Sequence, residues 1–132
     1  MGFKLEIITP RGIYLEKEVD SLTVKLSSGY RTFLKGHAPL IGSLAYAPMH
    51  IISLGKVDYY ALHGGAINVT KEKVVLIVNA IEHAKDIDVA RAKESKKRAE
   101  ERISKKDPDI DIKRARLALT RALTRLKAAE QK

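Results

Sequence analysis

The pattern of the chain changes abruptly after Ala84, and this change limits the fold more than any other feature of the sequence. All eight glycines lie before this point, among frequent turn signals and short apolar segments. The residues that follow contain no glycine and carry charged side chains at helical spacing. Glycine at short intervals favours tight turns between strands, whereas periodic charged segments favour helices. The sequence therefore predicts a β domain over residues 1–84 and a helical segment over residues 85–132.

The first part of the chain has the periodicity of short strands. Residues 3–7 and 22–26 alternate apolar and polar side chains, as half-buried strands do. Residues 57–62 are a further candidate, and the β-branched run at 74–78 is typical of a strand buried on both faces. The turn signals between strands are Pro10–Gly12, Ser27–Gly29, Lys35–Gly36, Gly55–Lys56, Gly64–Gly65 and Thr70–Lys73. We expect about ten short strands in an antiparallel β-sandwich or barrel.

Two helices are expected after Ala84. Asp86 is suited to cap a first helix that runs to about Ser104, and Asp107 with Pro108 is suited to begin a second. Alanine dominates the apolar positions, which are Ala92, Ala99 and Ile103 on the first helix and Ala115, Leu119, Ala122, Leu126 and Ala129 on the second. Such contacts bury little area, at roughly 25 cal/mol per Å². We therefore expect the helical hairpin to dock weakly and to be able to leave its dock.

The positive charge of the chain is concentrated in its helical part. The net charge is +9, of which residues 1–84 contribute +2 (nine Lys/Arg, seven Asp/Glu) and residues 85–132 contribute +7 (sixteen and nine). No acidic residue occurs from Ile112 to Ala129. This distribution indicates an anionic partner, which is a nucleotide, a nucleic acid, an acidic protein surface or a membrane face. Residues 85–132 contain no aromatic side chain that would stack on bases, which argues against nucleic acid.

Several classes of catalytic and metal-binding protein are disfavoured. The chain has no cysteine, no glycine-rich phosphate loop and no arguable Ser-His-Asp arrangement, so we predict no catalytic residue. The histidines lack metal-ligand spacing, and we expect loop or strand-edge roles for His37, His50, His63 and His83. There is no apolar run long enough to span a bilayer and no signal-peptide pattern, so we expect a cytoplasmic protein.

The helical part carries a candidate anion site. Asp88, Arg91 and Arg98 fall on one side of a helix at successive offsets of three and seven. Arg121 and Arg125 lie one turn apart on the second helix, and a hairpin would bring them toward Asp88. Arginine suits phosphate because its guanidinium donates two parallel hydrogen bonds. From spacing alone, an ordinary intrahelical ion pair between Asp88 and Arg91 is the competing interpretation.

Three stretches together resemble the epsilon-subunit family of bacterial F-type ATP synthases, and the resemblance covers the whole chain. The first is GHAPL at residues 36–40. The second is HGG at residues 63–65, followed by the strand at 74–78 and AIE at 80–82. The third is IDVARA at residues 87–92, which is similar to the nucleotide-binding motif of the Bacillus-like, ATP-binding members. The order of the three stretches and the chain length make the resemblance specific.

The resemblance implies a fold and a set of sites. The fold is an N-terminal β-sandwich, which binds the gamma subunit and the c-ring, followed by a C-terminal antiparallel two-helix hairpin. ATP, alone or with Mg²⁺, is implied as a regulatory ligand at Glu82, Ile87, Asp88, Arg91, Arg98, Arg121 and Arg125. Contact with the gamma subunit and c-ring is implied for a loop edge at Tyr30, Arg31, Gly36 and His37. Contact of the extended hairpin with the beta subunit of F1 is implied for Arg114, Arg116, Arg121 and Arg125, and the alpha subunit is implied as a further partner.

We therefore expect a non-catalytic rotor subunit of a proton-translocating ATP synthase, bound peripherally at the cytoplasmic face of the membrane through the complex. A mobile hairpin would inhibit ATP hydrolysis, and ATP would stabilise its folded state. The alternative is a basic nucleic-acid-binding module with a β-barrel and a helical tail. Within the residue set, Glu82 can equally be a solvated strand-end carboxylate, and the basic run from Lys113 to Lys127 can be a solvated helix face.

Overall fold

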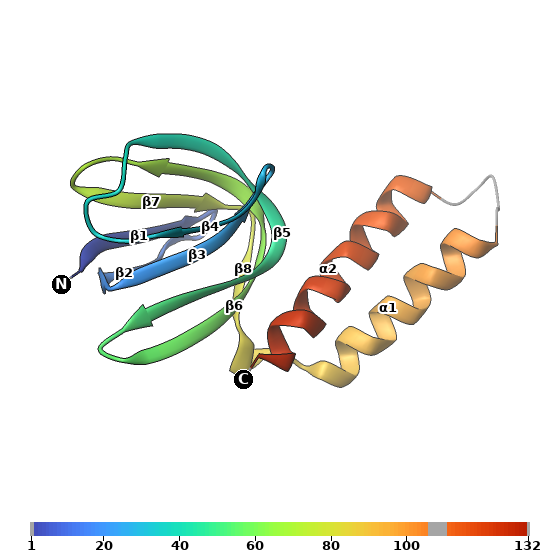
Figure 1. Ribbon diagram of the computed structural model, residues 1–132. Coiled ribbons are helices and arrows are strands. Elements are labelled where there is room, and N and C mark those ends of the chain that lie inside the picture. Colours follow the sequence, from blue (N-terminus) through green and yellow to red (C-terminus); the bar gives the residue numbers. More distant parts are fainter. Residues whose placement is uncertain (1, 106–110, 132) are drawn as a thin grey trace.

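The computed structural model describes residues 2–105 and 111–131 as a β-sandwich followed by a helical hairpin (Figure 1). The elements are β1 (Phe3–Thr9), β2 (Gly12–Val19), β3 (Ser21–Leu26), β4 (Gly29–Phe33), β5 (Leu40–Ser53), β6 (Lys56–Val69), β7 (Lys73–Val78), β8 (Ile81–His83), the 3₁₀ helix η1 (Ala84–Asp86), α1 (Val89–Ser104) and α2 (Ile112–Glu130). The described residues form eight strands instead of about ten, because β5 and β6 each run for 14 residues.

The strands form one sheet that folds over itself, so the predicted sandwich is confirmed. The strand order is β2-β1-β7-β6-β5-β3-β4, with β8 paired to β6 off this path. Every pairing between described strands is antiparallel except that of β1 with β7, which is parallel. β6 joins the two layers, because its residues 65–69 pair with β7 and its residues 60–62 pair with β8. The core between the layers is apolar and includes Leu5, Ile7, Leu22, Val24, Met49, Ile51, Leu62, Ile67 and Leu76.

The burial pattern agrees with the pattern predicted from the sequence at β1 and β3 but not at β7. Phe3, Leu5 and Ile7 are buried in β1, whereas the intervening Lys4 is exposed. The β-branched run of β7 was expected to be buried on both faces, and this is wrong, because Ile77 is 56% exposed. β7 lies against the core on one face only.

Gly64 and Gly65 do not form the turn that was expected of them. Both lie within β6 at positive φ values of 75° and 143°, where glycine is strongly preferred. A Cβ atom on Gly65 would lie 2.2 Å from the carbonyl oxygen of Ile77. The glycine pair therefore allows β6 to approach β7 closely while the strand continues from one layer to the other.

The hairpin begins two residues later than expected. Residues 84–86 form η1, and Asp88, not Asp86, is the N-cap of α1, because its side chain accepts the Arg91 backbone N–H at 3.1 Å. α1 ends at Ser104, as predicted. The expected cap at Asp107 and the adjoining proline lie outside the described residues. In the described part of α2, Asp111 is the N-cap and accepts the backbone N–H three residues on.

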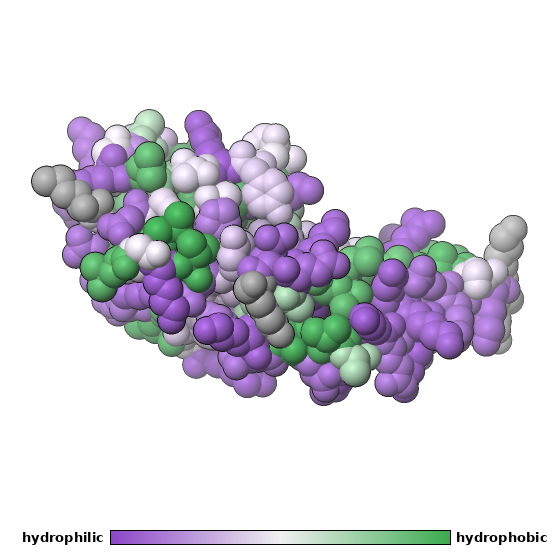
Figure 2. Space-filling view, turned by 60° about the horizontal axis from the view of Figure 1, so that its bottom comes forward, coloured by the Kyte–Doolittle hydropathy of each residue, from purple (hydrophilic) through white to green (hydrophobic). Residues whose placement is uncertain are grey.

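The two helices lie outside the sandwich, with α2 between the sheet and α1 (Figure 1). α2 packs against β5 and β6, and α1 packs against α2. The side chains that the hairpin buries are small, namely Ala92, Ala99, Ala115, Ala122, Thr124 and Ala128. Hydrophilic side chains cover much of the hairpin surface in Figure 2. Of the described helices, none has the length and apolar character that crossing a membrane would require.

Candidate functional site

A cavity of about 300 Å³ lies where the sandwich meets both helices of the hairpin. Its walls come from β8, η1, α1 and α2, and we refer to it as the interdomain cavity. Its lining residues are Glu82, Asp86, Asp88, Arg91, Ala92, Ser95 and Arg125. The structure thus brings together four of the seven residues predicted to bind ATP, and these come from both domains.

Local structure fixes the acidic side of the cavity. Asp88 is at the N-cap of α1, where a carboxylate satisfies a free backbone N–H and lies at the positive end of the helix dipole. Its bond goes to the backbone of Arg91, and the two side chains form no ion pair among the described residues. The competing interpretation of this motif as an intrahelical ion pair therefore does not match the structure. Arg91 is instead one of the residues that line the cavity.

Glu82 and Arg125 connect the sandwich to the hairpin. Arg125 Nε on α2 donates to Glu82 Oε1 on β8 at 2.5 Å, and both side chains are about one-third exposed, at 35% and 34%. Burial alone would raise the pKa of the Glu82 carboxyl, but the hydrogen bond and charge of Arg125 outweigh it, so the pKa lies below its ordinary value. A third group, the His63 imidazole, also hydrogen-bonds Glu82 Oε1, at 3.2 Å. Glu82 is therefore a paired carboxylate and not a solvated one.

Three of the predicted ligand-binding residues lie outside the cavity in this conformation. Arg98 pairs with Glu94 one turn away, and its side chain is 66% exposed. Arg121 does not line the cavity, although its charge acts on His63. Ile87 is buried against Ala61, and so has a packing role here. These residues would have to reorient, or act indirectly, to contribute to a ligand site.

The formal charge of the residues that line the interdomain cavity determines whether an anionic nucleotide would be attracted there. Three carboxylates (Glu82, Asp86, Asp88) and two guanidiniums (Arg91, Arg125) give a formal sum of −1. A triphosphate would be repelled by this sum unless further arginines turned inward or a cation accompanied it. The donors for phosphate are present, and the volume is at the low end for ligand pockets. The residues fit a nucleotide only after a local rearrangement.

The loop edge that was predicted to contact other subunits is split between two places. Arg31 and His37 line a cavity of about 240 Å³ at the β4–β5 connection, and Gly36 there has a φ of 83°. The His37 ring packs edge-on against Phe3, with centroids 5.3 Å apart. Tyr30, the neighbour of Arg31 along the strand, points away from this cavity, because successive side chains of β4 lie on opposite faces.

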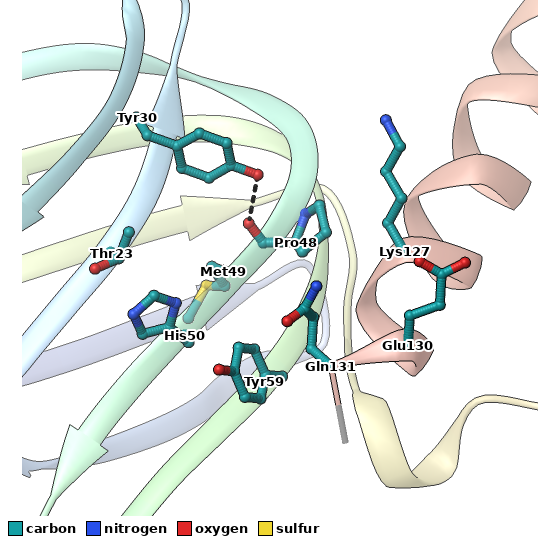
Figure 3. Close-up of a pocket in the computed structure, with 9 residues that line it drawn as sticks. All are labelled: Thr23, Tyr30, Pro48, Met49, His50, Tyr59, Lys127, Glu130 and Gln131. Carbon is teal, nitrogen blue, oxygen red and sulfur yellow. Dashed lines mark hydrogen bonds between the residues drawn. The ribbon is translucent and has the colours of Figure 1, made fainter.

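Tyr30 instead faces the C-terminal end of the hairpin (Figure 3). Its ring lines a cavity of about 420 Å³ between the sheet and the last turn of α2, and its hydroxyl donates to the Pro48 carbonyl at 3.3 Å. Rings from neighbouring strands, those of His50 and Tyr59, form another wall, and Lys127 lies on the helix side. Tyr30 is thus positioned to contact the docked hairpin.

The residues predicted to contact the beta subunit are distributed along α2. Arg114, Arg116 and Arg121 are exposed, and the described residues offer none of them an ion-pair partner. Arg125 is engaged by Glu82 in this conformation, so it is available to another protein only after that pair has broken.

Sequence reasoning missed three residues at the site. Asp86 and Ser95 line the interdomain cavity, and His63 contacts Glu82 from within the sandwich. His63 was assigned a loop or strand-edge role, and this is wrong, because it lies in β6 and is only 1% exposed. The one signal in the sequence was its place directly before the glycine pair, which by itself does not reveal a carboxylate partner 19 residues away.

Comparison with known proteins identifies similar chains over the full length. The family model described as "ATP synthase, Delta/Epsilon chain, beta-sandwich domain" matches residues 2–84, and the "long alpha-helix domain" model of the same chain matches residues 85–130. The ATP synthase epsilon chains of Bacillus mycoides and Bacillus cytotoxicus are 40% and 41% identical to it, each over 98% of both chains. That of Clostridium novyi is 40% identical over 94% of this chain and 95% of its own.

Solved structures show the same fold. A chain of the Euglena gracilis mitochondrial ATP synthase, in a structure of its OSCP/F1/c-ring, aligns with a TM-score of 0.82 at 20% identity. The alignment covers 90% of the present chain and 76% of that chain. At this identity the likeness concerns the fold alone, and it includes both the sandwich and much of the hairpin.

Proposed function

The chain belongs to the delta/epsilon chain family of ATP synthases, and on that basis we propose that it serves as the epsilon chain of a bacterial F-type enzyme, a non-catalytic subunit of the central stalk. The observation that carries this proposal is the 40–41% identity to Bacillus epsilon chains over nearly the whole of both sequences. In this role the subunit couples rotation to ATP synthesis without itself reacting with ATP. It would be held peripherally at the cytoplasmic face of the membrane by its partners in the complex.

The sandwich would bind the gamma subunit and the c-ring. The cavity at the β4–β5 connection supports this assignment, because Arg31 and His37 line it together with Pro39 and Leu40. The same stretch of chain carries exposed apolar side chains at Leu34 and Ile41, which are 58% and 81% exposed. Exposed apolar residues next to an arginine are typical of the core of a protein interface. The connection lies at the end of the sandwich remote from η1, so contact there leaves the hairpin free to move (Figure 1).

The hairpin would regulate ATP hydrolysis by occupying two states. In the docked state, α2 packs on β5 and β6 as observed. In the released state, the hairpin would extend and place Arg114, Arg116, Arg121 and Arg125 against an acidic surface of the beta subunit, which would block rotation in the hydrolysis direction. The alanine-lined contact supports this exchange, because an interface of small side chains has a modest free energy of docking.

ATP would act as a regulatory ligand that favours the docked state, with or without Mg²⁺. The interdomain cavity supports this idea, because its residues come from both domains and converge only when the hairpin is docked. A ligand shifts an equilibrium only through its differential affinity for the two states. A nucleotide that needs Glu82 from β8 together with Arg91 from α1 and Arg125 from α2 would have that differential affinity.

The assembled complex provides the test of the regulatory role. We expect truncation after Ala84 to leave assembly with the gamma subunit intact and to raise ATP hydrolysis above that of the full-length complex. Equal hydrolysis rates in the two complexes would contradict an inhibitory hairpin while leaving the role of the sandwich standing.

Calorimetric titration of the isolated chain with ATP tests the ligand site. We expect saturable binding that is lost in the Asp88→Ala/Arg91→Ala double variant. Lys71→Ala/Glu72→Ala, which likewise removes one cation and one anion but at the exposed β6–β7 turn, is the charge-matched control. Binding that survives in the first variant would exclude the interdomain cavity as the site.

A further inference from the structure

A chain of hydrogen bonds leads from the interior of the sandwich to the hairpin. His63 on β6 is 1% exposed, and its Nε2 atom is 3.2 Å from Glu82 Oε1 on β8. The same carboxylate oxygen accepts from Arg125 Nε on α2 at 2.5 Å. The buried imidazole therefore contacts the side chain on which the hairpin docks, although it does not itself touch the hairpin's arginine through a hydrogen bond.

The surroundings of the imidazole determine which nitrogen carries the proton. Nδ1 is buried and has no hydrogen-bond partner among the described residues. A buried N–H without an acceptor is costly, so the neutral ring carries its hydrogen on Nε2 and donates it to Glu82. The ring is held in place by the Tyr46 ring, with centroids 6.0 Å apart, and the backbone N–H of His63 donates to the Ala80 carbonyl at 3.0 Å. The donor is thus fixed in orientation.

We propose that His63 is a positioning residue, whose Nε2–H holds the Glu82 carboxylate toward Arg125 and so stabilises the docked hairpin, and that a proton on this imidazole favours release. The inference deepens the proposed function and rests on it, because it presumes that the hairpin leaves its dock. It makes the docking equilibrium, and with it the interdomain cavity, sensitive to pH near neutrality.

The sign of the pH effect follows from the groups that face His63. β8 presents Glu82, α2 presents Arg125 and Arg121, β5 presents the Tyr46 ring, and the Asn79–Ala80 link carries no charge. Burial, followed by the charges of the two arginines, lowers the pKa of His63 despite its bond to Glu82. Release of the hairpin would remove both arginines and admit water, which would raise this pKa.

The released state therefore binds the proton more tightly than the docked state does. Docking is fully favoured above the pKa that His63 has in the released state and weakens as pH falls through that value. Glu82 acts in the same direction, since its pKa is also lowered in the docked state, but it titrates at more acidic pH because the ordinary value of a glutamate is 4.5. A comparison of pH 8 with pH 6 consequently reports on histidines. His63 must then be separated from His50, whose pKa is also lowered by burial in the cavity beside the end of α2.

The absence of cysteine allows a direct measurement of docking in the full-length chain. Lys56→Cys on β6 and Lys97→Cys on α1, both at exposed positions, accept a donor and an acceptor dye. Single-molecule energy transfer then counts docked and released molecules. In the parent we expect the docked-to-released ratio to fall at least about threefold from pH 8 to pH 6. In His63→Phe, which keeps a ring but no donor, we expect a ratio about tenfold lower at pH 8 and no further fall at pH 6.

Two more variants separate positioning from packing. His63→Gln retains an N–H donor that does not titrate, so it should restore much of the docked population at pH 8 and hold it at pH 6. His50→Phe removes the histidine in the cavity beside the last turn of α2, whose pKa is also lowered by burial. If His63 carries the pH response, this variant should keep the response of the parent. A pH response that persists in His63→Phe would overturn the role of His63. A parent that shows only the docked distance at both pH values would overturn hairpin release, and with it the regulatory part of the proposed function.

Discussion

Enlarging Ala128 should shift the hairpin toward its released state without unfolding the sandwich. Ala128 on α2 is fully buried, and it packs against Ala61 of β6, also fully buried, and Ile87, which is 6% exposed. Leucine would add three carbon atoms at a position where two alanine methyl groups already meet. Because Ala61 belongs to a paired strand, the sheet cannot yield easily, and the helix must move away.

The expected magnitude follows from measurements on overpacked cores. Such substitutions cost about 1–3 kcal/mol, which corresponds to a decrease of about 5- to 150-fold in the docked-to-released ratio. The pair of dyes at positions 56 and 97 would report this decrease. Ala90→Leu on α1 makes the same chemical change at an exposed position and should leave the ratio unchanged. An unchanged ratio in Ala128→Leu would refute the view that this contact controls docking.

Three further predictions concern glycine, helix caps and acid stability. Gly65→Ala should lower the free energy of unfolding, measured in urea, by about 3 kcal/mol or more, because the added Cβ would collide with the β7 backbone. Gly55→Ala is the control: its Cβ would have no atom within 4 Å, so it should cost only the strain of a positive φ, about 1–2 kcal/mol. Asp88→Ala and Asp111→Ala should each destabilise the hairpin by about 1 kcal/mol through a lost N-cap, but only the former should weaken ATP binding in calorimetry. The hydrogen bond from His83 on β8 lowers the pKa of Asp58. The stability that this hydrogen bond provides is therefore present above the ordinary aspartate pKa and is lost as the pH falls through the lowered pKa of Asp58. The urea midpoint of Asp58→Asn should therefore fall less between pH 6 and pH 3 than that of the parent.

The sequence was sufficient for the fold because local signals and global architecture agree over most of the chain. Alternation placed Phe3, Leu5 and Ile7 in the core, and the change of texture after Ala84 separated strands from helices. The prediction of burial failed at Ile77, because a continuous β-branched run has no periodicity that distinguishes a strand with one buried face from a strand with two. The prediction of a turn failed at Gly64 and Gly65, because the same residue type serves both tight turns and close approach of two backbones.

The candidate site was only partly predictable for a different reason. Glu82, Asp88, Arg91 and Arg125 converge as the family motif implies, because cap geometry and helix register fix their directions. Arg98 does not, since a glutamate one turn away competes for its guanidinium. His63 could not be found from spacing, because its partnership with Glu82 depends on which strands pair across the sheet. Contacts made by tertiary pairing leave no periodic signal in a single sequence.

The order of the layers has a consequence for how strongly the dock must hold. The covalent link at residues 84–88 leads into α1, the outer helix, while α2, the helix that touches the sheet, ends beside η1 (Figure 1). The hairpin therefore binds the sandwich as a tethered ligand does, at an effective concentration that a short link sets in the millimolar range or above. A contact whose intrinsic dissociation constant is itself about millimolar, or about −4 kcal/mol, would then be evenly balanced between its two states. Interfaces of alanine suit that balance, because a larger apolar surface would make the tethered association effectively permanent.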